Sequence, residues 1–158
     1  MLNNLFNEVC DLIDKEWIYE TEDFQKERQY QLDLTNFLRK ELNRPNIFSS
    51  KNVTVTLEGQ NNCDIAINRD EIGIELKKDL HNENEINRLW GQLDNFTKTF
   101  DDIIVVLVGN PVPHYRDLLK QKIVERNQDR RMNEPYIEII YPSDEDDDKG
   151  DGFPVWRI

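Results

Sequence analysis

Cysteine and glycine are scarce in these 158 residues, and their scarcity excludes several kinds of site. Cys10 and Cys63 have no second cysteine or histidine at ligand spacing, and His81 and His114 are far apart, so neither a disulfide framework nor a zinc site is expected. The six glycines form no phosphate-binding loop, and the chain has no serine elbow or Cys–His pair. Both cysteines stand in apolar patterns, which predicts that they are core residues.

Long hydrophobic runs are also absent. The longest apolar run, residues 103–108, is much too short to cross a bilayer. Residues 1–17 carry Glu8, Asp11 and Asp14 and no basic leader, which is unlike a signal peptide. These features predict a protein of the cytoplasm, including that of a host cell if the source is viral, with no membrane association.

Basic residues are few. The chain has 20 Lys and Arg against 32 Asp and Glu, a net charge of −12, whereas nucleic-acid-binding proteins usually display a basic surface. Part of the deficit is local, because residues 144–151 hold six acids and one lysine. We interpret residues 142–152 as an acidic, mobile loop, since they lack the alternating ligands of a calcium loop.

Hydrophobic periodicity predicts the order of the elements. Helical spacing of apolar residues indicates a first helix over residues 1–20 and a second ending near residue 42, and strict alternation then indicates strands. The predicted elements that follow are strands at 53–58, 63–67 and 72–77, a helix at 86–100, a buried strand at 103–108, a helix at 115–123, a strand at 136–141 and an edge strand at 153–158. This order predicts a single α/β domain, residues 1–158, whose core lies within 24–110.

The hairpin between the second and third strands carries the main chemical signal. Pairing residue 68 with residue 71 places Asp64 opposite Glu75, with Cβ atoms about 4.5–5.5 Å apart. Two carboxylates that close repel each other unless a divalent cation lies between them. Lys77 lies on the same face as Glu75, because side chains alternate along a strand. A solvated polar face would show the same trio, and the spacing alone leaves both interpretations open.

Two helices contribute further polar residues. Glu27 and Gln31 share the stripe of apolar residues that faces the sheet, where a glutamate is unfavourable without a partner. Gln92 lies between Leu89 and Phe96, at the edge of the inward stripe of its helix. Taken singly, Glu27 is also compatible with a solvent-exposed first turn, and Gln92 with a boundary residue.

Together these residues resemble the signature of the PD-(D/E)xK nuclease superfamily. The resemblance rests on Asp64-x10-Glu75-Leu-Lys77 with an apolar strand around each acid, and it spans about residues 26–109. Glu27 resembles the acid of the family's first core helix, and Gln92 resembles the glutamine of the helix after the third strand. Cys63 stands where the proline of the family name would be.

The resemblance implies a restriction-endonuclease-like three-layer sandwich, with a mixed central sheet of about five strands flanked by helices. It implies a nuclease, most of all an endodeoxyribonuclease, that uses Mg²⁺ or in its place Mn²⁺ and acts on DNA as a homodimer. Asp64, Glu75 and Glu27 would bind the metal, Lys77 would orient or deprotonate the attacking water, and Gln92 would steady Lys77 or a phosphate oxygen. The alternative is a non-catalytic module of the same fold that binds a protein or a nucleic acid, which the acidic charge favours.

Overall fold

The computed structural model describes residues 4–17, 26–45 and 52–142. The predicted strand at 153–158 and almost all of the predicted acidic loop at 142–152 lie outside the described residues. None of the described helices is long and apolar enough to cross a membrane.

Within the described residues, five strands form one mixed sheet, and their order across the sheet is their order along the chain. β2 (Ile65–Ile67) pairs antiparallel with both β1 (Val55–Leu57) and β3 (Ile72–Lys78), whereas β4 (Asp102–Val108) and β5 (Tyr136–Ile140) run parallel to β3. Parallel neighbours need a long crossover connection, and each crossover contains a helix. These helices are α3 (Glu83–Phe96) and α4 (Pro113–Asp129).

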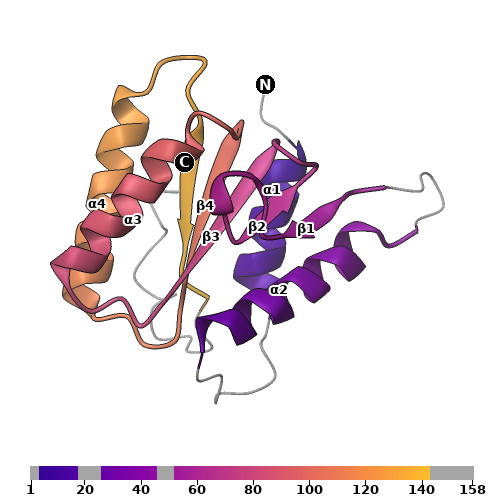
Figure 1. Cartoon of the computed structure of the whole chain (residues 1–158), viewed down its shortest axis with the longest axis horizontal. Helices are drawn as coiled ribbons and strands as arrows, with labels where there is room; N and C mark the ends of the chain where they lie inside the picture. The colour runs from indigo at the N-terminus through magenta and orange to yellow at the C-terminus, as the bar shows by residue number, and fades with distance from the viewer. Residues whose placement is uncertain (1–3, 18–25, 46–51, 143–158) are drawn as a thin grey trace.

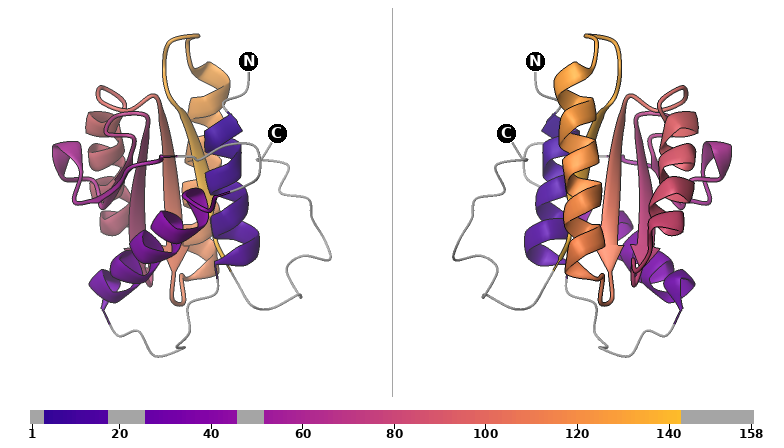
Figure 2. Two further views of the ribbon diagram at one scale, coloured as in Figure 1. Left: turned by 90° about the vertical axis from the view of Figure 1, so that its right-hand side faces the viewer. Right: turned by 90° about the vertical axis from the view of Figure 1, so that its left-hand side faces the viewer.

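Helices cover both faces of the sheet (Figures 1 and 2). On one face lie α1 (Asn4–Asp11), the π-helical turn η1 (Leu12–Glu16) and α2 (Glu27–Leu42), and on the other lie α3 and α4. Side chains of β4 alternate between the two hydrophobic cores, and residues 103–108 are completely buried. A strand covered on both faces reads as a continuous apolar run. The predicted α/β class and buried strand are therefore confirmed.

The predicted elements that fall within the described residues are present, and their boundaries differ where side chains or turns replace backbone pairing. The strand predicted to start at Cys63 starts two residues later, after the short 3-10 turn η2 (Gln60–Asn62). The first predicted helix changes to π-helical geometry at Leu12, and Trp17 is the last residue described before the gap at 18–25. Cys10 and Cys63 are buried and free, as expected for core residues.

Each end of the sheet is closed by an asparagine side chain. At the β1 end, Asn43 Oδ1 accepts the Val53 N–H at 2.7 Å and Asn43 Nδ2 donates to the Val53 carbonyl at 2.9 Å. At the β5 end, Asn127 makes the same two bonds to Ile137, at 3.1 and 2.8 Å. A side-chain amide here imitates a neighbouring peptide unit. Each asparagine therefore occupies the outward backbone groups of one residue, Val53 just before β1 and Ile137 in β5.

Candidate active site

The β2–β3 pairing brings Asp64 and Glu75 together. Ile65 pairs with Ile74, so the next pair along the hairpin is Asp64, just before β2, opposite Glu75 in the middle of β3. The Asp64 N–H donates to Glu75 Oε2 at 3.3 Å, and Glu75 is only 5% exposed. The predicted register of this hairpin is confirmed.

The acids occupy the place that a longer β2 would have filled. β2 pairs with β3 only as far as Ile74, whereas β4 accompanies β3 to its end, so the other edge of β3 needs hydrogen-bond acceptors. The Leu76 N–H donates to Asp64 Oδ2 at 2.8 Å, and the Lys78 N–H donates to Glu27 Oε2 at 3.1 Å. Glu27 lies in the first turn of α2. Three carboxylate side chains therefore lie along one edge of β3. Glu75 comes from the strand itself, Asp64 from the position just before β2, and Glu27 from α2.

Gln31 fixes the orientation of Asp64. It is 6% exposed, and its Nε2 donates to Asp64 Oδ1 at 3.0 Å and to the Asp64 carbonyl at 3.1 Å. Its Oε1 accepts from Arg28 Nη1 at 3.1 Å, and the same nitrogen of Arg28 donates to Glu58 Oε1 at 2.8 Å. The expectation that Gln31 faces the sheet is confirmed. Sequence patterns gave no reason to choose Arg28, which lies one turn before Gln31 and joins α2 to the end of β1.

Burial and mutual repulsion hold a proton on the acid pair. Burial, together with the charges of Asp64 and Glu27, raises the pKa of Glu75 to about 9. Burial also raises the pKa of Asp64, to about 6; the Glu27 charge acts in the same direction, and the Leu76 N–H opposes it. At neutral pH the two facing carboxyl groups therefore share one proton, a state that belongs to the pair. A cation bound between the two carboxyl groups would replace that proton and compensate both negative charges.

Lys77 shares the face of β3 that Glu75 occupies, because Leu76 between them points into the opposite core. Its ammonium lies 3.2 Å from Glu85 Oε2 on α3. Over the described residues no ion pair joins Lys77 to Asp64 or Glu75. The sequence did not identify Glu85 as a site residue, although the capping pattern Asn82-x-x-Glu85 places it in the first turn of α3.

Gln92 remains apart from this network. It is exposed on α3, and within the described ranges no hydrogen bond connects it to Lys77, Asp64 or Glu75. Its predicted role at Lys77 or at a phosphate stays a prediction.

The donor set suits a hard divalent cation that keeps part of its water. Within residues 4–17, 26–45 and 52–142, no group of three or more His, Cys, Asp and Glu side chains is arranged to hold a metal ion. Glu27 is directed at the Lys78 N–H, which leaves Asp64 and Glu75 as the facing pair. Mg²⁺ is commonly bound by one or two carboxylates together with waters and substrate phosphates. The pair fits that type of site, and Glu27 is the nearest further carboxylate.

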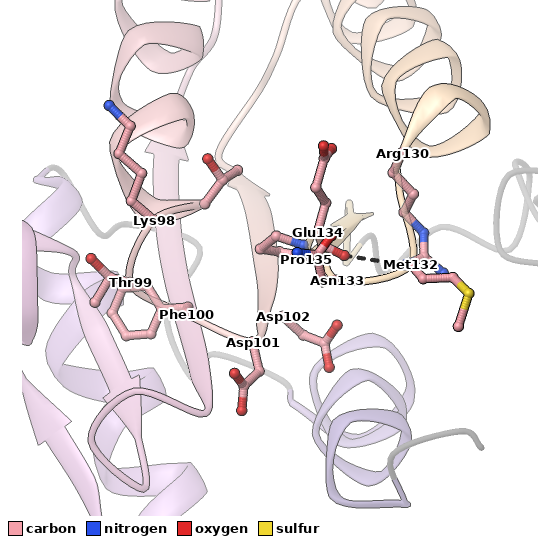
Figure 3. Close-up of a pocket in the computed structure, with 11 residues that line it drawn as sticks. Lys98, Thr99, Phe100, Asp101, Asp102, Arg130, Met132, Asn133, Glu134 and Pro135 are labelled. Atoms are coloured by element: carbon pink, nitrogen blue, oxygen red, sulfur yellow. Dashed lines mark hydrogen bonds between the residues drawn. The ribbon is translucent and has the colours of Figure 1, made fainter.

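The surface hollows lie beside this site or away from it. The hollow in Figure 3, about 420 Å³, lies between residues 97–102 and 130–135 at the amino ends of β4 and β5. Its lining mixes Lys98 and Arg130 with acidic side chains. A second hollow, about 640 Å³, lies over β1 and β2 and includes Ala66, two residues from Asp64. Neither hollow is lined by Asp64 or Glu75, so the candidate site is the acid pair itself.

No family model matches this chain, and no significant match is found among curated proteins or solved structures. The function of the site must therefore follow from its own geometry.

Proposed function

We propose that this chain is a Mg²⁺-dependent nuclease of the PD-(D/E)xK type, and more specifically an endodeoxyribonuclease. The observation that carries the proposal is the facing Asp64–Glu75 pair, in which Glu75 is buried, Asp64 is partly buried, and both pKa values are raised. The mixed five-stranded sheet with helices on both faces is compatible with a restriction-endonuclease-like sandwich. Buried acids with raised pKa values beside a specific charged partner occur most often at functional sites.

Asp64 and Glu75 would bind the cation through their oxygens, with Glu27 as a further ligand. When bound, Mg²⁺ neutralises charge on the phosphoryl group and lowers the pKa of an attacking water. Gln31 holds Asp64 by two hydrogen bonds, which fixes one ligand before any substrate arrives. Such support from outside the ligand set is a general requirement for an effective metal site.

Lys77 would act on the water or on the phosphate. Its ammonium lies on the Glu75 face of β3 and can orient the attacking water or stabilise negative charge on the phosphoryl oxygens. Gln92 would assist from α3 once substrate is bound, since its side chain is exposed and available.

A second candidate function is a non-catalytic binding module that docks a basic partner. The net charge of −12 favours it, because polyanionic nucleic acid is repelled by an acidic surface. The nuclease is preferred because a solvated binding surface would not require a buried Glu75 to face a partly buried Asp64.

The test is the conversion of supercoiled plasmid DNA by purified protein, with Mg²⁺ and with EDTA, beside the Glu75→Gln variant. The proposal expects Mg²⁺-dependent nicking or linearisation by the wild type and none by the variant. Parallel reactions with linear duplex, single-stranded DNA and RNA identify the substrate. Equal cleavage by both proteins would remove the assignment of this pair as the active centre. A wild-type protein that cuts none of these substrates would leave the binding module as the better account.

A further inference from the structure

Among the described residues of α3, Glu85 is the one that forms an ion pair with β3, and its partner is Lys77. Its Oε2 lies 3.2 Å from Lys77 Nζ, and the two side chains are 16% and 21% exposed. Fully solvated ion pairs contribute little and are easily exchanged, whereas pairs largely withdrawn from water are held more firmly. The lysine is therefore restrained by a carboxylate that belongs to a different element from its own strand.

The start of α3 holds Glu85 in place. Asn82 Oδ1 accepts the Glu85 N–H at 2.9 Å, and Glu85 Oε1 accepts the His81 N–H at 3.1 Å. His81 Nδ1 also lies 2.8 Å from the same carboxylate oxygen. Burial alone would raise the pKa of Glu85, but the bonds from the His81 N–H and from Lys77 outweigh it and lower the pKa. The carboxylate is thus charged, and its two oxygens serve different donors.

The loop between β3 and α3 is tied down as well. Asp79 Oδ1 accepts the Asn110 N–H at 2.7 Å, and the Val112 N–H donates to the Leu80 carbonyl at 2.8 Å. These bonds fix the loop after β3 to the loop after β4. The carboxylate that restrains Lys77 is consequently carried on a rigid base, which is what accurate placement of a reacting group requires.

We propose that Glu85 is a positioning residue that restrains the Lys77 ammonium on the Glu75 face of β3. This inference rests on the proposed catalytic role of Lys77. Glu85 itself would not touch substrate or cation. Its carboxylate limits the positions of a side chain that would otherwise rotate about four bonds, so the ammonium meets the phosphoryl group without prior reorganisation.

Glu85→Gln tests this directly, because glutamine has the same shape but only one acceptor oxygen for two donors. The Asn82 cap uses the Glu85 backbone N–H, and the amide oxygen of the glutamine can still accept the His81 N–H, so the start of α3 is preserved. Glu83→Gln is the matched control, since Glu83 is an exposed acid in the same first turn of α3 and the substitution makes the same change of charge. Both variants are compared with the wild type in Mg²⁺-dependent DNA cleavage.

The expected result is a kcat about 10–100-fold lower in Glu85→Gln, with KM changed by less than about 2-fold, as is typical when a supporting residue of a metal site is removed. Glu83→Gln should retain the kcat of the wild type. Equal kcat values in the two variants would overturn the positioning role.

A second readout does not depend on activity. Acetylation of lysine amines by a limiting reagent is followed by mass spectrometry, with Lys78 as internal reference, because its own partner Asp79 at 2.5 Å is unchanged. Lys77 should react several-fold faster in Glu85→Gln than in the wild type or in Glu83→Gln. Unchanged labelling of Lys77 would overturn the inference. A wild-type protein without any cleavage would instead overturn the proposed function, and faster labelling would then show that the contact exists without that role.

Discussion

Replacing Glu75 by glutamine should stabilise the metal-free protein at pH 7. Burial and the Asp64 charge raise the pKa of Glu75 from its ordinary 4.5 to about 9, so at pH 7 its carboxyl group is protonated when folded and ionised when unfolded. Folding must then take up a proton across roughly 2.5 pH units, which costs about 3 kcal/mol at about 1.4 kcal/mol per unit. A glutamine amide is neutral in both states and can donate to Asp64 as the protonated acid does. The variant should therefore avoid most of that cost.

The sign of the pH dependence follows from the same shift. A raised pKa in the folded state means that the unfolded chain binds fewer protons, so the wild-type protein loses stability as pH rises from about 4.5 towards 9. The stability difference between variant and wild type should be small near pH 5 and should widen by about 1.4 kcal/mol per pH unit above it.

Urea unfolding at pH 5, 6, 7 and 8 in EDTA measures this difference, and thermal unfolding at pH 7 should show a rise in Tm of roughly 5–10 °C. The exposed Glu83→Gln should follow the wild-type pH profile. A wild-type protein more stable than Glu75→Gln at pH 7, or a stability difference that does not change with pH, would refute the electrostatic reasoning.

Three further predictions concern catalysis, assembly and the acidic segment. Lys77→Met should keep the thermal stabilisation that Mg²⁺ or Mn²⁺ gives the wild type, because it removes no ligand, yet lose cleavage by about 100-fold or more; loss of the metal-induced shift would contradict its role. Light scattering should give the mass of a homodimer, at least with DNA and Mg²⁺ present, and a monomeric mass that does not change on adding DNA and Mg²⁺ would count against it. Deleting residues 144–151, net charge −5, should tighten DNA binding at low salt, and an unchanged affinity would mean that this segment lies beyond about one Debye length of the bound DNA.

The central hairpin could be predicted because its information is local. Alternation fixes which side chains share a face, and a short symmetric turn fixes the register, so Asp64 opposite Glu75 followed from the positions of the turn residues alone. The inward direction of Gln31 followed in the same way from helical period. Both deductions need only the geometry of one or two neighbouring elements.

The contacts between distant elements could not be predicted in the same way. Arg28 joins Gln31 to Glu58, and Glu85 restrains Lys77, because α2 and α3 start at particular heights along β3. Helical period gives the face that a residue occupies but not its height beside the sheet. Gln92 is on the expected helix but is exposed, and among the described residues no hydrogen bond joins it to Asp64, Glu75 or Lys77.

The most direct test of the acid pair is a calorimetric titration with Mn²⁺ at pH 7, repeated in two buffers of different ionisation enthalpy. Because Asp64 and Glu75 share one proton without metal, binding of a cation between them should release close to one proton per ion, and Glu75→Gln should neither release it nor bind with comparable affinity. Binding by the wild type without proton release, or equal binding by Glu75→Gln, would contradict the claim that this pair is the metal centre.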